Sequence, residues 1–284
     1  MEVRLADCAG FCFGVKRAVD TVYEQLKNGK TIYTYGPIVH NEEVVRELSE
    51  KGVRVLENKE ELKHLKAGEN IPTVIIRAHG VAKEIYDIME ANGLECIDAT
   101  CPFVKKIHRI VELKSTEGYH VIVVGDPKHP EVEGIVGWCP GPVTVLETPE
   151  QAENFVKTEG EKLCIVSQTT YNYNKFQYIV EIFEKKGYND SVVNTICNAT
   201  EERQRSAKTI AAEADVMIVI GGKHSSNSRK LYEICQRECE HTYFIQTLDD
   251  LHLDLPKAVR LVGITAGAST PNKLIEEVQN YVRI

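Results

Sequence analysis

The sequence lacks several features that would place it in a common class. No two cysteines are separated by only two residues, so the paired patterns of zinc ribbons and small ferredoxins are absent. No run approaches the roughly 18 consecutive apolar residues of a membrane span. The start, MEVRLADCAG, has neither the basic nor the apolar region of a signal peptide. These absences predict a cytoplasmic protein that makes no use of a membrane.

Positive charge is also scarce. The 34 Lys and Arg residues face 42 Asp and Glu, which gives a formal net charge of −8 at pH 7. An acidic chain is a poor general binder of nucleic acid, although local basic groups can still hold a small anion. We therefore expect a small molecule or a protein as the partner, and no nucleic acid. The 284 residues suffice for two domains, or for three small ones.

Cysteine, in contrast, is plentiful. Nine cysteines are many for a cytoplasmic chain, where thiols stay reduced and clustered cysteines more often bind metal or do chemistry than form disulfides. Five are interpreted as structural because they lie in apolar strand-like runs, in a Pro- and Gly-rich loop, or on the apolar face of a predicted helix: Cys8, Cys96, Cys139, Cys164 and Cys235.

One unit recurs along the chain: a β-branched run, then a polar loop, then a helical pattern. The runs with their loops are TIYTYGPIVHN, TVIIRAHG, HVIVVGDPKHP, KLCIVSQTT, VMIVIGGKHSSNS and RLVGITAGAST. Apolar residues at three- and four-residue spacing, such as Val15, Ala18, Val19 and Val22, predict the helices. Strands that alternate with helices predict parallel α/β layers, in which ligands gather outside the carboxyl ends of strands.

Three further cysteines each lie just before a predicted helix. Cys12 precedes an amphipathic pattern, and Cys101 precedes Pro102, a favoured first helical residue. Cys197 precedes Asn198, which we expect to cap its helix. A helix N-terminus lowers a thiol's pKa and favours an anionic sulfur ligand. One such cysteine per third of the chain suits a zinc ion, or a 4Fe-4S cluster with one open iron, with three unrelated cysteines as the alternative.

The six polar loops are rich in hydrogen-bond donors. His40, His79 and His129 each follow a strand, and the segments SQTT, HSSNS and AGAST follow three others. Neither a P-loop nor a GxGxxG fingerprint is present. Imidazoles, hydroxyls and amides can all donate to phosphate oxygens, so the loops favour a diphosphate ligand. Glu131 would have a raised pKa beside such an anion and would suit a proton donor, whereas a solvated loop glutamate is the alternative.

Eight motifs occur in a fixed order over residues 9 to 270: AGFCFGVKRAV, GPIVHN, RAHG, DATCP, HPEVEG, SQTT, SSNS and TAGAST. Together they closely resemble the 4-hydroxy-3-methylbut-2-enyl diphosphate reductase (LytB) family. The resemblance implies three α/β domains, at 1–100, 101–196 and 197–284, in a pseudo-threefold arrangement around a central 4Fe-4S cluster. It implies one ligand from each domain, at Cys12, Cys101 and Cys197, leaves one iron open, and excludes Cys96.

The resemblance also implies a reaction, the two-electron reductive dehydroxylation of (E)-4-hydroxy-3-methylbut-2-enyl diphosphate to isopentenyl and dimethylallyl diphosphate. This reaction is the last step of the methylerythritol phosphate route to isoprenoids. Glu131 matches the family's proton donor. Substrate contacts carry over to residues in the matching motifs: His40, His79, His129, Thr169, Thr170, Ser225, Ser226, Asn227 and Ser269. One threonine is expected to touch the substrate and the other to hold a water or the glutamate. His224 departs from the pattern, which has a smaller polar residue there.

Electrons need a source, and the sequence has no flavin or nicotinamide fingerprint. The expected donor is a ferredoxin or flavodoxin that docks transiently on a monomer.

Two alternative functions come from other classes of protein. A zinc hydrolase of phosphorylated substrates would use the three cysteines and the polar loops around a metal-bound water. A non-enzymatic iron-sulfur sensor would need the cluster but neither Glu131 nor the SSN loop.

Overall fold

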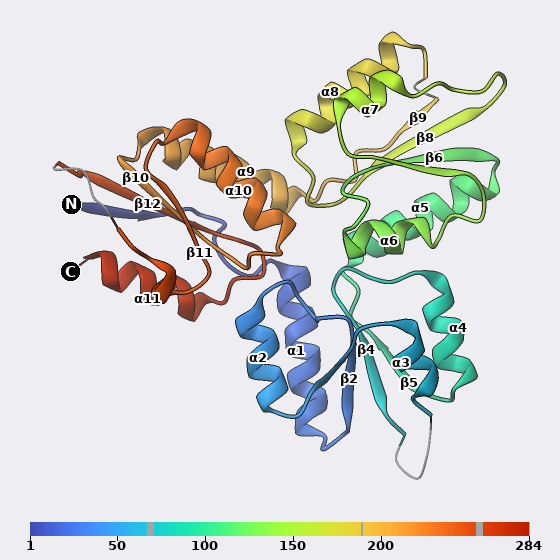
Figure 1. Cartoon of the computed structure of the whole chain (residues 1–284), viewed down its shortest axis with the longest axis horizontal. Helices are drawn as coiled ribbons and strands as arrows, with labels where there is room; N and C mark the ends of the chain where they lie inside the picture. Colours follow the sequence, from blue (N-terminus) through green and yellow to red (C-terminus); the bar gives the residue numbers. More distant parts are fainter. Residues whose placement is uncertain (67–70, 189, 254–257, 284) are drawn as a thin grey trace. The chain divides into compact units, whose positions relative to one another are not determined.

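A computed structural model describes residues 1–66, 71–188, 190–253 and 258–283, and its strands form three parallel sheets of four strands each (Figure 1). Helices alternate with the strands along the described residues, apart from the 3-10 turn between β11 and β12, so the predicted mixed α/β fold class is confirmed. The pseudo-threefold placement around a central site stays a prediction, as do the domain boundaries after residues 100 and 196. Among the described residues, no helix has the length and apolar character needed to cross a bilayer.

The three sheets share one strand order. Across the sheets, the strands are β3 (Arg54–Leu56), β2 (Ile32–Tyr35), β4 (Thr73–Ile76) and β5 (Glu95–Asp98); β7 (Val143–Leu146), β6 (Tyr119–Val124), β8 (Lys162–Ser167) and β9 (Ser191–Val192); and β11 (Thr242–Ile245), β10 (Val216–Ile220), β12 (Leu261–Ala266) and β1 (Glu2–Leu5). Each sheet thus places its second strand outside its first, and its third and fourth on the other side. The N-terminal strand β1 serves as the fourth strand of the last sheet.

The two central strands of each sheet are β2 and β4, β6 and β8, and β10 and β12. These are the six strands that the sequence predicts, and nearly all of their residues are buried. The outer strands are shorter or half exposed, so their apolar pattern is weaker. At the junction between central strands the chain departs in opposite directions, which leaves space at their carboxyl ends. All six predicted polar loops begin there.

The connecting segments are helical, with these bounds: α1 (Phe13–Lys27), α2 (Glu42–Glu50), α3 (Lys59–His64), α4 (Lys83–Ala91), α5 (Pro102–Thr116), α6 (Pro130–Val136), α7 (Pro149–Asn154), α8 (Tyr173–Lys185), α9 (Asn198–Glu213), α10 (Ser226–Glu238), a 3-10 turn (Leu248–Asp250) and α11 (Asn272–Arg283). The expected N-cap at Asn198 is wrong. Asn198 is the first residue of α9, and Cys197 is the cap, with an extended backbone at φ −71° and ψ 133°.

The chain divides into two compact units, Met1–Lys16 with Val39–Glu47 and Cys197–Ile284, and Arg17–Ile38 with Leu48–Ile196. We call these the first and the second unit. The first unit contains the β11-β10-β12-β1 sheet, which is packed on one face by α11 and on the other by α9 and α10. The second unit contains the other two sheets, and Phe176 and Phe183 of α8 are fully buried against β6 and β8.

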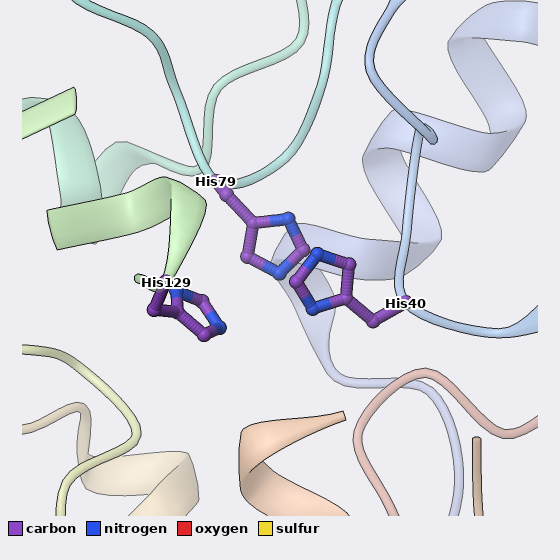
Figure 2. Close-up of side chains that lie close together, drawn as sticks. All are labelled: His40, His79 and His129. Carbon is purple, nitrogen blue, oxygen red and sulfur yellow. The ribbon is translucent and has the colours of Figure 1, made fainter. Parts of the chain in front are cut away.

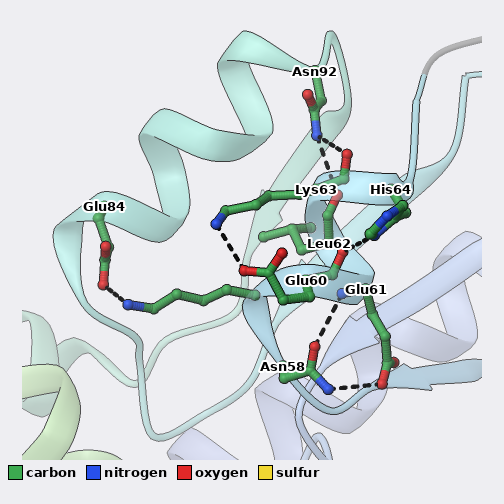
Figure 3. Close-up of polar contacts among 9 residues, drawn as sticks. Asn58, Glu60, Glu61, Leu62, Lys63, His64, Glu84 and Asn92 are labelled. Atoms are coloured by element: carbon green, nitrogen blue, oxygen red, sulfur yellow. Dashed lines mark hydrogen bonds and ion pairs between the residues drawn. The ribbon is translucent and has the colours of Figure 1, made fainter.

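Polar groups hold the short helix α3 in the second unit (Figure 3). Asn58 accepts a hydrogen bond from the backbone N–H of Glu61 at 3.0 Å, which caps the helix. Asn92, at the end of α4, donates to the carbonyls of Leu62 and Lys63, each at 3.2 Å. Six residues are too few for a stable isolated helix. The cap and the contacts with α4 therefore fix a segment that its own sequence would not.

Candidate functional site

The three cysteines that precede helices occupy equivalent places in the fold. Cys12 follows β1, Cys101 follows β5 and Cys197 follows β9, and each of these is the fourth strand of its sheet. Each then precedes the helix that leads to the first strand of another sheet, namely α1, α5 or α9. All three are partly exposed and free of disulfides. We call them the helix-start cysteines.

Three of the cysteines interpreted as structural have thiols that burial holds protonated. Burial raises the pKa of the Cys139 and Cys235 thiols to about 12. Cys164 is fully buried in β8, and burial raises its pKa too. Cys235 lies fully buried on α10 beside Leu231, as its sequence setting predicts. A thiol held protonated is a poor metal ligand. Cys139, Cys164 and Cys235 are therefore poor candidates to hold iron.

A buried cation lies close to two of the helix-start cysteines in the first unit. Arg203 of α9 is only 3% exposed, and its Nη1 donates to the Ala266 carbonyl at 2.8 Å. Burial lowers the pKa of Arg203, whereas the nearby thiols of Cys12, Cys8 and Cys197 raise it. The sequence does not identify Arg203 as a site residue, because nothing in its local sequence distinguishes it from Arg205, the exposed arginine of the same helix.

Loops after three central strands meet at the backbone of His40 in the first unit. Ser269 donates from Oγ to the His40 carbonyl at 2.9 Å. A Cβ on Gly222 would lie 2.7 Å from the same carbonyl, closer than side chains approach a backbone oxygen. Thr270 also donates to the Ile220 carbonyl, at 3.0 Å. These contacts bring the predicted residues His40 and Ser269 together and require glycine at position 222.

The SSN loop contributes unpaired polar atoms to the same unit. Ser225 caps α10 by accepting from the N–H of Ser228 at 3.3 Å, and Ser226 is the first helical residue. Asn227 is 4% exposed, and neither its amide oxygen nor its amide nitrogen has a hydrogen-bond partner among the described residues. Buried polar atoms in native proteins are nearly always paired, so these two indicate a place for a ligand. His224, the residue that departs from the family pattern, is exposed.

Two of the predicted histidines lie edge to face in the second unit. Figure 2 labels all three; His79 follows β4 and His129 follows β6, and the centroids of these two rings are 5.5 Å apart at 78°. His129 Nδ1 accepts from the N–H of Glu131 at 3.1 Å. That bond requires an unprotonated Nδ1 and so places the proton of the neutral ring on Nε2. His129 can therefore present an N–H donor to an anion.

The loop that carries His79 packs against the neutral ring of His108. Gly80 has φ +73°, and a Cβ there would lie 2.6 Å from Cε1 of His108. His108 in turn stacks on Trp138, with ring centroids 5.2 Å apart at 16°. Burial lowers the pKa of His108 to about 4, so the ring is neutral at ordinary pH. Position 80 must therefore be glycine for the loop to rest on this ring.

Glu131 is a buried carboxyl with an unusual pKa. It is 1% exposed, and burial raises its pKa from 4.5 to about 7. Thr169 donates to both carboxyl oxygens, from its backbone N at 2.6 Å and from its hydroxyl at 2.7 Å. Thr170 instead accepts from Gln168 at 3.0 Å. Of the two predicted threonines, Thr169 is thus the one that holds the glutamate, and Glu131 can carry or release a proton near neutrality.

Arg17 fixes the segment before Cys101 and was not predicted. Its guanidinium, on α1, donates to the carbonyls of Asp98, Ala99 and Thr100 at 3.2, 3.2 and 2.9 Å. The backbone N–H of Cys101 donates to Ala78 at 2.9 Å. Arg17 lies in the quoted AGFCFGVKRAV motif, but its partners are some eighty residues away, so no local pattern could indicate them.

Comparisons with known proteins agree over the full chain. The model of the LytB protein family matches residues 3–283. The 4-hydroxy-3-methylbut-2-enyl diphosphate reductase of Caldanaerobacter subterraneus subsp. tengcongensis is 48% identical over 285 residues, covering 100% of this chain and 97% of the relative. The protein of that name from Clostridioides difficile is 44% identical, covering 99% of each chain.

Solved structures show the same likeness. The E-1-hydroxy-2-methyl-but-2-enyl-4-diphosphate reductase of Plasmodium falciparum matches with a TM-score of 0.92 at 31% identity, covering 100% of this chain and 88% of that chain. A second reductase structure, described as the terminal enzyme of the non-mevalonate pathway, matches with a TM-score of 0.70 at 43% identity, covering 100% and 99%.

The raised pKa of Glu131 predicts a pH-dependent stability. Its folded pKa of about 7 lies above its ordinary 4.5. The protonated carboxyl therefore contributes stability that is complete below pH 4.5 and is lost as the pH rises through 7, by up to about 1.4 kcal/mol per pH unit. Glu131→Gln should remove this dependence in urea unfolding measured over that range. Glu133→Gln, an exposed change on the same helix, should follow the wild type. Parallel curves for wild type and Glu131→Gln would contradict the shift.

Arg17→Met should loosen the segment before Cys101. Hydrogen bonds from a charged donor contribute about 1.5–3 kcal/mol each, so amide exchange at Thr100 and Cys101 should quicken by at least about tenfold. Arg17→Lys should give an intermediate result, because a single ammonium nitrogen cannot reproduce the separate positions of Nη1 and Nη2, from which the guanidinium reaches the three carbonyls. Arg46→Met, which removes only a surface ion pair with Glu43, is the control. Equal exchange in Arg17→Met and Arg46→Met would refute the role.

Proposed function

The chain belongs to the LytB family, and on that premise we propose that it reduces (E)-4-hydroxy-3-methylbut-2-enyl diphosphate to isopentenyl and dimethylallyl diphosphate. The family depends on an iron-sulfur cofactor. The observation that carries the proposal is Glu131, a buried carboxyl with a pKa of about 7 that accepts two hydrogen bonds from Thr169. Glu131 lies two residues after His129, which is a candidate for binding phosphate. A proton donor beside anion-binding groups is what reductive removal of a hydroxyl requires.

The proposed ligands of a 4Fe-4S cluster are Cys12, Cys101 and Cys197, with one iron left without a protein ligand. Their equivalent places after the fourth strands and their partial exposure support this assignment. The buried Nε–H of Arg203, which has no acceptor among the described residues, fits a negatively charged iron-sulfur group better than a dry apolar contact. When bound, such a cluster supplies electrons one at a time and a Lewis-acidic iron for the substrate's hydroxyl oxygen.

The polar loops hold the diphosphate in this proposal. The groups proposed to contact it are the imidazoles of His40, His79 and His129, the hydroxyls of Thr170, Ser225, Ser226 and Ser269, and the Asn227 amide, with Thr169 acting through Glu131. The unpaired amide of Asn227 and the Nε2–H of His129 are suited to phosphate oxygens. Binding energy from the unreactive diphosphate then positions the allylic hydroxyl for reaction.

Glu131 supplies the proton that the departing oxygen needs. Two electrons and two protons enter, the allylic C–O bond breaks, and the oxygen leaves as water with one proton from Glu131. The second proton goes to the allylic carbon skeleton. The two hydrogen bonds from Thr169 lower the pKa of Glu131 against the effect of burial. They therefore stabilise the carboxylate that remains after proton transfer and keep the acid strong enough to donate.

The electrons come from a partner in this proposal, a ferredoxin or flavodoxin, because the sequence has no nicotinamide or flavin fingerprint. The small-molecule substrate follows from the family. The monomeric state, the cytoplasmic location and the absence of nucleic-acid and membrane partners stay predictions.

Glu131→Gln tests the proton donor. The variant should keep its iron and its absorbance near 400 nm but lose at least about a hundredfold in turnover, the usual contribution of general acid catalysis. Glu133→Gln, on the same helix and exposed, should turn over normally. Product formation by the Glu131→Gln enzyme at the wild-type rate would remove Glu131 from its role as proton donor. A wild-type protein that carries the cluster but forms no product would instead support the sensor.

Cys101→Ser and Cys96→Ser form a matched pair for the ligands, because the two cysteines flank the same segment. Anaerobic iron and sulfide analysis should show most of the iron lost in Cys101→Ser and retained in Cys96→Ser. The reverse result would place the second ligand at Cys96. A colourless wild-type protein with one zinc would instead support the zinc hydrolase.

A further inference from the structure

Arg203 is buried without a carboxylate partner. It is 3% exposed, and among the residues that the structure describes no acidic side chain lies within ion-pair distance of it. A buried charge is normally paired, because leaving water costs several kcal/mol. Its Nη1 donates to the Ala266 carbonyl at 2.8 Å, but its Nε is buried and has no acceptor within the described ranges. The guanidinium therefore lacks a carboxylate counter-charge, and its Nε–H lacks an acceptor.

The two proposed ligands of the first unit are tied to the elements that hold Arg203. Cys197 caps α9, the helix on which Arg203 lies. The N–H of Cys12 donates to the Ala268 carbonyl at 3.1 Å, two residues beyond the carbonyl that anchors Arg203. The groups that act favourably on the guanidinium are the thiols of Cys12, Cys8 and Cys197, in that order. Sulfur atoms are thus the groups near Arg203 that could provide the missing counter-charge.

We propose that Arg203 is the counter-cation of the iron-sulfur site, pairing with the thiolates of Cys12 and Cys197 and donating its Nε–H to a sulfur of the cluster. This rests on the proposed function, since it assumes those ligands. Each electron that enters makes the site more negative, so a fixed buried cation stabilises the reduced form more than the oxidised form. Hydrogen bonds to cluster sulfurs act in the same direction. Arg203 is therefore a positioning residue that raises the reduction potential.

The test is a redox titration of the anaerobically purified holoprotein, with Arg203→Met, Arg203→Lys and Arg205→Met compared with the wild type. Arg205 lies on the same helix but is exposed, so its replacement removes the same charge without touching the site. In Arg203→Met the ratio of reduced to oxidised cluster at a fixed potential should fall at least about tenfold, equivalent to about 59 mV for one electron. Arg205→Met should have the reduction potential of the wild type, and the potential of Arg203→Lys should lie closer to the wild type than to Arg203→Met.

A spectroscopic measurement separates the hydrogen bond from the charge. With guanidino-¹⁵N arginine, the reduced wild-type cluster should show a nitrogen hyperfine coupling that Arg205→Met keeps and both Arg203 variants lose. Iron loss in Arg203→Met but not in Arg203→Lys would also support the counter-charge. Unchanged potential in Arg203→Met, an equal shift in Arg205→Met, or loss of iron from a folded Arg203→Lys protein would overturn it.

Failure of this inference and failure of the proposed function give different results. A wild-type protein without a cluster, or with a cluster but no reductase activity, contradicts the proposed function. A wild-type protein that carries the cluster and catalyses the reduction, while Arg203→Met keeps the wild-type potential, contradicts only the role of Arg203.

Discussion

Parallel pairing of two central strands constrains the polar loops of this chain. In each sheet the first and third strands lie side by side, and the chain leaves their carboxyl ends in opposite directions. A side chain placed just after such a strand has its position set by a buried hydrogen-bonded ladder and not by the loop itself. Glu131 and Thr169 illustrate this: they are far apart in sequence, but β6 and β8 are paired from Tyr119 with Lys162 to Val124 with Ser167, so the loops after them meet.

Burial acts on opposite charges in opposite ways within this framework. It raises the pKa of Glu131 toward neutrality, so the carboxyl can hold a proton. It lowers the pKa of His108, so the ring against which the His79 loop packs is uncharged. Arg203 remains charged because the guanidinium starts from a far higher pKa. The same desolvation therefore yields an acid, a neutral ring and a fixed cation, according to the group on which it acts.

The sequence revealed the parts of this fold that depend on local pattern. Central strands such as β10 are buried on both faces and appear as continuous apolar runs, whereas an outer strand such as β9 has only two residues and little pattern. The helix after Cys101 was evident from Pro102. The sequence predicts the cap of α9 one residue too late, because Asn198 is of a common capping type while Cys197 is not.

Contacts between distant segments could not be predicted in the same way. The choice of Thr169 over Thr170 as the partner of Glu131 depends on where the turn after β8 points each side chain, and both residues offer the same hydroxyl. Arg17 and Arg203 bond to backbone carbonyls, which every residue has, so no partner residue type in the sequence could signal either contact.

The last sheet also determines when the site can form. Strand β1 has its strand partner in β12, and the Cys12 N–H donates to Ala268, so the backbone hydrogen bonds that hold the segment carrying Cys12 form only after residues 261–268 have been synthesised. Cys197 lies in the same unit. The contacts that anchor Cys12 and Arg203 are thus complete only when β1, the first strand of the chain, pairs in its last sheet. In the proposed site, the backbone contacts that anchor Cys12 and Arg203 are therefore both made to residues 266–268, after the last central strand has formed.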